Sequence, residues 1–229
     1  MIYVESKRKS LATIRAKHPN SVIIDVTSRG EEPWVQVSPF YPHGGIPVPY
    51  SESIFSASVE GVWQGLKVFE GEDVDFSKFT NEAMKGIKRT VRKFGKPLGH
   101  RKGVYGTELL DYGTAREKIY LRTYAWMLEN KVADIIERLT HMAETGDVVL
   151  LDYDTNDDIT NLKSPISHAS LVKLYIEKKH PHLKVSTVAP PVDLLKADII
   201  KPAKPPRKRS TPKPSVIKGK DDPGQLSFL

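Results

Sequence analysis

Hydrophobic and polar residues recur along the chain with different periods, and these periods predict its secondary structure. Residues 21–27 and 147–152 are runs of β-branched and aliphatic residues, which are typical of buried strands. Apolar spacing and capping residues predict five helices, and these cover residues 5–17, 55–69, 81–94, 114–142 (with one break) and 164–179. The sequence therefore predicts an α+β fold that is mostly helical.

The predicted helix over residues 55–69 has two distinct faces. Its apolar face repeats at alternating spacings of four and three residues, and consists of Phe55, Val59, Val62, Leu66 and Phe69. Beside it runs a stripe that mixes polar and aromatic residues: Ser56, Glu60, Trp63, Gln64 and Lys67. This second stripe is a candidate functional surface. The alternatives are that Glu60 and Lys67 pair through Gln64 at a helix margin, and that Trp63 belongs to the core.

Composition narrows the class of protein. The chain has 229 residues and no cysteine, which excludes disulfides, thiolate zinc sites and a cysteine nucleophile. No run approaches the roughly 20 apolar residues of a membrane span. Residues 1–9 lack the order of a signal peptide. We therefore expect a cytoplasmic protein, in a bacterial cell or a phage-infected host, with no membrane partner.

Established nucleotide-binding and nucleophile motifs do not occur in the sequence. The chain contains no Walker, dinucleotide or Gly-x-Ser-x-Gly fingerprint. His100 and His168 are isolated and lack the spacing of a zinc site, so we expect them to be structural. No metal and no cofactor is predicted.

Most of the net charge of +7 belongs to the last 31 residues, 199–229. This tail has eight basic residues and two acidic ones, and it is rich in proline. Proline at that density blocks regular hydrogen bonding. We predict a globular domain over residues 1–198, a disordered basic linker over 199–224 that binds DNA phosphates through counterion release, and a terminal peptide over 225–229. The alternatives for the basic linker are a solubilising tail and, at residues 206–209, a nuclear import signal.

The terminal peptide resembles the short motif by which DNA polymerases and repair proteins dock on the bacterial or phage sliding clamp. In that motif a glutamine bonds to the rim of a pocket, and apolar residues fill a cleft. The matching residues here are Gln225, Leu226, Phe228 and Leu229. The sliding clamp is therefore an expected partner. The alternative is a frayed hydrophobic terminus without a partner.

Several motifs, in order along residues 34–158, resemble the NADAR superfamily. The most specific is residues 58–69, which is similar to the signature helix of that family. The others are residues 37–42, 46–49, 115–118 with 126–128, and 151–154. Members of that family bind ADP-ribose-like groups or cleave N-glycosidic bonds. The resemblance implies a NADAR-like domain with a nucleotide or ADP-ribosyl ligand.

Three carboxyl groups are candidates for that chemistry. Cleaving the bond between ribose C1 and a base nitrogen builds positive charge on the sugar. A buried carboxylate can stabilise this charge or take a proton from the attacking water, and a second acid can protonate the leaving base. We assign the first role to Glu60 and the second to Asp152 or Asp154. The alternative for residues 152–158 is that they cap the next helix.

Other side chains are candidates for holding the ligand. Lys67 and the loop His100–Lys102, with its flanking glycines, could hold a phosphate or pyrophosphate. Gln64 belongs to the same stripe as Lys67, and Trp63 or Trp34 could stack on a base. The alternative for the basic loop, Arg101 included, is a solvated turn.

The combined prediction is a hydrolase of an N-glycosidic or ADP-ribosyl bond on a nucleotide or on DNA, tethered to the replication clamp. The alternative is a non-catalytic phage or bacterial replication or transcription factor that binds the clamp. A further alternative is a nucleotide sensor that has lost catalysis. It arises because no tryptophan follows Trp126, where the family's late motif usually places one.

Overall fold

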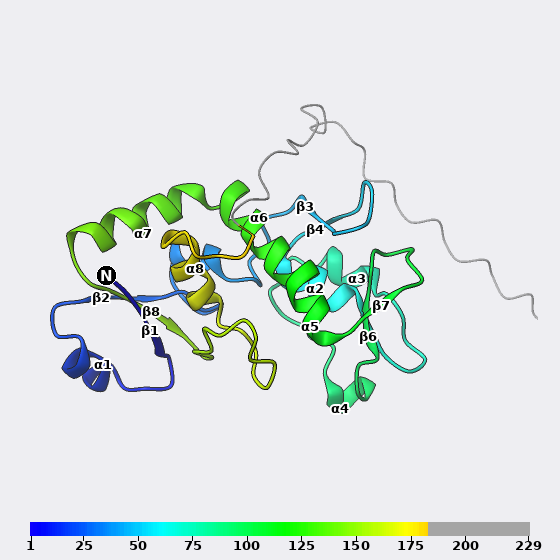
Figure 1. Ribbon diagram of the computed structural model, residues 1–229, viewed down its shortest axis with the longest axis horizontal. Coiled ribbons are helices and arrows are strands. Elements are labelled where there is room, and N and C mark those ends of the chain that lie inside the picture. The colour runs from blue at the N-terminus through cyan, green and yellow to red at the C-terminus, as the bar shows by residue number, and fades with distance from the viewer. Residues whose placement is uncertain (183–229) are drawn as a thin grey trace, which may run out of the picture. The chain divides into compact units, whose positions relative to one another are not determined.

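The computed structural model describes residues 1–182, and its largest sheet has three parallel strands (Figure 1). The strand order is β1 (Ile2–Ser6), β8 (Val148–Asp152) and β2 (Val22–Asp25). The strand β8 pairs on both sides, and all five of its residues are buried. The two predicted strands are thus confirmed as β2 and β8, whereas β1 was not predicted.

The alternating side chains of β8 enter two different hydrophobic clusters. Val148 and Leu150 belong to the main core, whereas Val149 and Leu151 pack with Ile14 in a smaller cluster. Ile14 lies in α1 (Leu11–Lys17), and the other side of the sheet is covered by α7 (Ala133–Thr145) and α8 (His168–Ile176) (Figure 1). A parallel sheet covered on both faces explains why β8 reads as a continuous apolar run. The fold is α+β.

The remaining elements are short and build the other half of the described chain. The helices are η1 (a 3₁₀ turn, Trp34–Val37), α2 (Val59–Gly65), α3 (Phe76–Phe79), α4 (Val91–Phe94), α5 (Tyr112–Ala115), η2 (a π-helix, Arg116–Leu121) and α6 (Arg122–Asn130). The strands form two antiparallel sheets, β3 (Ile46–Pro47) with β4 (Phe55–Ser56), and β5 (Lys67–Val68), β6 (Gly99–Arg101) and β7 (Leu109–Leu110) in that order.

The prediction of a helix over residues 5–17 is wrong in its first half. Glu5 lies in β1, and its buried carboxylate accepts hydrogen bonds from Lys9 and Lys17, both at 2.6 Å. His18 contacts the same carboxylate at 3.1 Å. These partners offset the burial of Glu5, and they hold its pKa at about 2. The ion cluster joins β1 to α1.

The prediction of a helix over residues 81–94 is also wrong, since only α4 at its end is helical. Met84 and Gly86 have positive φ angles of 54° and 68°, which a right-handed helix does not allow. Side chains secure this irregular path, because Lys78 donates to the carbonyl of Gly86 at 3.1 Å and Asn81 donates to the carbonyl of Lys85 at 3.0 Å.

Two further expectations need correction, and a third is confirmed. The helix predicted over 55–69 is confined to α2, since its two ends form strands. The helix predicted over 164–179 is shorter, since α8 begins at His168 after the N-cap Ser167 and ends at Ile176. The helical region 114–142 is confirmed, with a break at residues 131–132 between α6 and α7. None of the helices in the described part of the chain combines the length and apolar character needed to cross a membrane.

Candidate functional site

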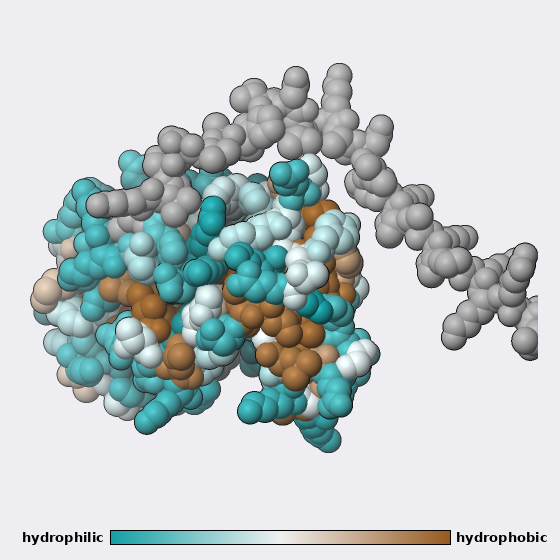
Figure 2. All heavy atoms as spheres, turned by 45° about the vertical axis from the view of Figure 1, so that its right-hand side comes forward, coloured by the Kyte–Doolittle hydropathy of each residue, from teal (hydrophilic) through white to brown (hydrophobic). Residues whose placement is uncertain are grey.

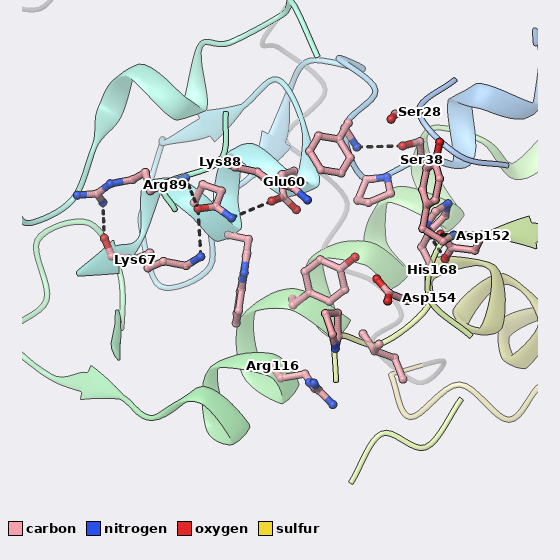
Figure 3. A pocket seen from close by; sticks show the side chains of 18 of the residues that line it. Ser28, Ser38, Glu60, Lys67, Lys88, Arg89, Arg116, Asp152, Asp154 and His168 are labelled. Carbon is pink, nitrogen blue, oxygen red and sulfur yellow. Dashed lines mark hydrogen bonds and ion pairs between the residues drawn. The ribbon is translucent and has the colours of Figure 1, made fainter. Parts of the chain in front are cut away.

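A pocket of about 450 Å³ lies where β2 and β8 end. Residues that follow β2, the first turn of α2, η2, and the segment from Asp152 to His168 all contribute to its wall. The carboxyl ends of parallel strands are a common place for ligand sites in mixed folds. The volume falls in the range of small-molecule sites. Figure 3 shows Glu60 and Lys67 on one side of this pocket, and Asp152, Asp154 and His168 on the other.

Glu60 is held in the first turn of α2. Ser58 caps this helix by accepting a hydrogen bond from the Gly61 N–H at 3.0 Å, and the Glu60 N–H donates to the carbonyl of Pro39 at 2.8 Å. The carboxyl group is buried but lines the pocket. Burial raises the pKa of Glu60, and the Gln64 hydrogen bond and the charges of Lys88 and Lys67 oppose this only in part.

The side chain of Gln64 fixes the carboxyl group of Glu60. Its amide oxygen accepts from the Arg89 backbone N–H at 2.9 Å and from the Lys67 ammonium at 3.1 Å. With the oxygen so placed, the amide nitrogen faces Glu60 and donates to Oε1 at 2.8 Å. Glu60 and Lys67 are therefore linked through Gln64, as one alternative interpretation of the sequence expected, and all three also line the pocket.

Trp63 stands between the pocket and the sheet β5-β6-β7. Its ring stacks on His100 with centroids 3.7 Å apart, and it makes edge contacts with Tyr112 and Tyr120. The Lys67 ammonium lies 5.9 Å from the Trp63 ring. Burial lowers the pKa of Lys67, with the Glu60 carboxylate opposing the shift. Trp63 is thus an aromatic wall of the pocket that also packs against the core.

Asp152 is held by a dense set of donors on the opposite wall. Its Oδ2 atom accepts from the Ser167 hydroxyl at 2.8 Å and lies 2.9 Å from His168 Nδ1. Its Oδ1 atom accepts from the Tyr153 N–H at 2.7 Å. The other His168 nitrogen lies 2.8 Å from the Val26 carbonyl. Because both ring nitrogens face acceptors, we assign His168 as a protonated imidazolium.

The pKa values of this pair agree with that assignment. Burial raises the pKa of Asp152, but the His168 charge and the hydrogen bonds outweigh burial, so the net shift is downward. Burial lowers the pKa of His168, yet its contact with Asp152 outweighs burial and the net shift is upward. Asp152 is consequently a fixed carboxylate and a poor proton donor. The neighbouring Asp154 lines the pocket, is half-buried and has no hydrogen-bond partner among residues 1–182.

Several pocket residues were not predicted as site residues, and among them Arg116, Tyr120 and Lys88 carry charge or a hydroxyl group into the wall. Arg116 and Tyr120 come from η2, and π-helical turns are frequent at functional sites. Arg116 donates to carbonyls of the 159–164 segment and so fixes one border of the pocket. Burial, and then the charges of Glu60 and Asp152, raise the pKa of Tyr120 well above its usual value. Lys88 lies in the irregular segment before α4. A helical-spacing search misses these residues because tertiary packing alone brings them together.

Several predicted ligand-binding residues do not line this pocket. The predicted loop is neither a phosphate cradle nor a solvated turn, because Gly99–Arg101 form strand β6. Arg101 makes a two-point contact with Asp73 at 2.9 and 2.8 Å, and Lys102 pairs with Glu108 at 2.7 Å. His100 stacks on the face of Trp63 that is turned away from the pocket. Trp34 packs against Arg138, whose guanidinium carbon lies 4.7 Å from the centre of the Trp34 ring. The proposed clamp-binding residues Gln225, Leu226, Phe228 and Leu229 lie outside the described residues.

The arrangement can perform acid–base chemistry on a polar ligand. A carboxyl group with a raised pKa exchanges protons more readily near neutral pH than an exposed one. Cationic groups at Lys67 and Lys88 lie near Glu60 and suit an anionic ligand part. Within residues 1–182, no group of histidine, aspartate and glutamate side chains has the geometry to hold a metal ion.

A family model matches residues 6–172, and its description is a family of unknown function (DUF6939). The matched range runs from the last residue of β1 into α8, and it includes every pocket residue named above. A comparison with curated proteins finds no match.

Proposed function

We propose that this chain, which belongs to the family of unknown function DUF6939, hydrolyses an N-glycosidic or ADP-ribosyl bond of a nucleotide, free or in DNA. The observation that carries the proposal is the buried carboxyl of Glu60, with its raised pKa, at a pocket whose other wall holds two more carboxyl groups. The aromatic wall at Trp63 suits a base, and the cations beside Glu60 suit phosphates.

The proposed reaction breaks the bond between ribose C1 and the base nitrogen. A water oxygen forms the new bond to C1, and the electron pair of the broken bond goes to the leaving nitrogen. Glu60 takes a proton from this water, and its raised pKa makes it a stronger base than an exposed glutamate. A solvent proton passes to the leaving nitrogen through Asp154, which lines the pocket and has no hydrogen-bond partner among residues 1–182.

Asp152 has a different role in this proposal. Its hydrogen bonds and its pairing with His168 keep it ionised, so it does not transfer the proton. Its fixed charge faces the pocket and can stabilise the positive charge that builds on the sugar.

The decisive variant is Glu60→Gln. This change keeps the volume and can still accept the Gln64 hydrogen bond, but it removes the base. We expect turnover to fall by about 100-fold or more while the melting temperature changes little. The measurement is release of ADP-ribose or free base from ADP-ribosylated DNA and from NAD, separated by chromatography. Glu70→Gln, an exposed position outside the pocket, is the matched control. Full activity of Glu60→Gln would remove Glu60 from the mechanism.

The second candidate is a protein that binds nucleotides without cleaving them, and serves as a replication or transcription accessory factor. The observation that favours it is the full commitment of Asp152 to internal partners. Calorimetric binding of ADP-ribose by the wild-type protein, with no product released from any substrate offered, would support this candidate over the hydrolase.

We also propose that the peptide Gln225–Leu229 recruits the protein to the sliding clamp, and its resemblance to clamp-binding peptides supports this. The double variant Leu226→Ala/Phe228→Ala should lose binding to an immobilised bacterial clamp, because the apolar contacts would be missing. Val216→Ala/Ile217→Ala removes a similar apolar area upstream and should bind as the wild type does. Equal binding by both variants would contradict clamp recruitment.

A further inference from the structure

Exposed basic side chains gather on one segment of the folded domain. Between residues 83 and 107 the chain has no acidic residue. Five exposed cations of this stretch form no ion pair with any residue in 1–182: Lys85, Lys88, Arg92, Lys93 and Lys96. We call residues 85–96 the basic rim. Since residues 1–198 are nearly neutral in total, the rim is a local excess of positive charge.

The basic rim borders the pocket directly. Lys88, Thr90 and Val91 line the pocket, and α4 continues the rim beyond it. In Figure 1, α4 lies at the lower edge of the described chain, close to β6. The space-filling view in Figure 2 shows hydrophilic side chains at this lower edge, beneath a hydrophobic patch. A ligand that contacts the rim can therefore also reach the pocket.

A buried arginine holds the rim in place. Arg89 is 3 % exposed, and its guanidinium lies 4.9 Å from the ring of Phe69 and 5.2 Å from that of Phe94. It donates to the Lys67 carbonyl, and its backbone N–H binds Gln64. Ile87 is also buried, so the rim alternates inward anchors with outward cations. The cations thus sit on a fixed backbone attached to α2.

We propose that the basic rim binds the phosphate backbone of single-stranded nucleic acid and presents one nucleotide of the strand to the pocket. Unpaired cations on a fixed surface release counterions when they meet phosphates. Val91 within the rim and Leu98 just after it are 62 % and 61 % accessible, and they offer apolar contacts to bases. A pocket beside such a surface is suited to an unstacked base. Presentation to the pocket rests on the proposed function, whereas strand binding does not.

The test compares two triple variants of the full-length chain that remove the same charge. The rim variant is Lys85→Gln/Arg92→Gln/Lys93→Gln, and the control is Arg15→Gln/Lys118→Gln/Arg122→Gln on exposed positions outside the rim. Both keep residues 199–229, so any binding by that tail is common to both. Binding of a fluorescent single-stranded oligonucleotide is measured as a function of salt, after circular dichroism has shown that both variants are folded.

We expect the rim variant to bind about tenfold more weakly than the control at low salt. The slope of log K against log salt should be smaller by about 2, since each phosphate contact to a single strand contributes about 0.7. Equal binding by the two variants overturns the proposal, as does rim-dependent binding to phosphatidylserine vesicles without rim-dependent binding to the oligonucleotide. If the rim variant binds more weakly than the control but the wild-type protein cleaves no substrate, only the proposed hydrolase activity is overturned.

Discussion

His100 is a buried imidazole at the back of the pocket wall. Neither of its ring nitrogens has a hydrogen-bond partner among residues 1–182, and its ring stacks on Trp63. Burial, and then the nearby charge of Lys67, lower its pKa to about 3. His100 is therefore neutral at pH 7, and its main contribution is the flat surface that supports Trp63.

This environment predicts how stability depends on pH. Between pH 6.5 and about 3, the unfolded chain binds a proton at His100 and the folded chain does not, so the free energy of unfolding falls as the pH falls. The slope from this group is about 1.4 kcal/mol per pH unit. His100→Phe should remove that slope and keep the stack. Urea unfolding from pH 4 to 7 measures it, with the exposed His141→Phe as the control. An unchanged slope in His100→Phe would show that His100 is accessible to protons in the folded chain.

At the scale of elements, the junction of β8 and α8 fixes one wall of the pocket. Ser167 accepts a hydrogen bond from the Ser170 N–H at 3.2 Å as the helix cap, and its hydroxyl donates to Asp152 at the end of the strand. One side chain thus serves both elements. His168, the first helical residue, adds the ion pair to the same carboxylate.

Ser167→Ala should therefore cost more than an ordinary surface change. We expect a loss of about 1–2 kcal/mol in the free energy of unfolding, because the variant lacks both the helix cap and the hydrogen bond from Ser167 to Asp152. Ser164→Ala is the matched control. The backbone carbonyl of Ser164 accepts hydrogen bonds from Arg116 and Asn156, and the variant keeps this carbonyl. Urea denaturation of both variants measures the difference. A larger loss for Ser164→Ala would mean that the helix starts where the sequence alone suggested.

Local patterns predicted some elements well. The helical spacing within α2 correctly placed Glu60, Trp63 and Gln64 together at the pocket, because three- and four-residue spacing is a property of the helix itself. Lys67 reaches the same pocket from β5, so its place was right but the helix predicted for it was wrong. The apolar run at residues 147–152 likewise predicted the buried strand β8. By contrast, the path of residues 81–90 depends on side chains such as Lys78 that bind its carbonyls, and no local pattern encodes them.

At the scale of the whole molecule, the pocket combines segments that are far apart in sequence. The prediction that Glu60 and the residues after β8 face one cavity rested on an interpretation of their chemistry, and the structure places them around the same pocket. Lys88 and Tyr120 were missed because charge and aromaticity alone do not show which surface a residue faces. Arg101 and Lys102 were misassigned for the same reason, since acidic neighbours neutralise them.

The position of β8 in the sheet also has a consequence for synthesis on the ribosome. β1 and β2 are early segments, yet each pairs with β8 and not with the other. Until residues 148–152 have left the exit tunnel, both early strands lack their partner, and their apolar side chains stay exposed to water. Closing such long loops is slow compared with forming local helices. The nascent chain is therefore expected to depend on chaperones until translation has passed the last strand of the sheet.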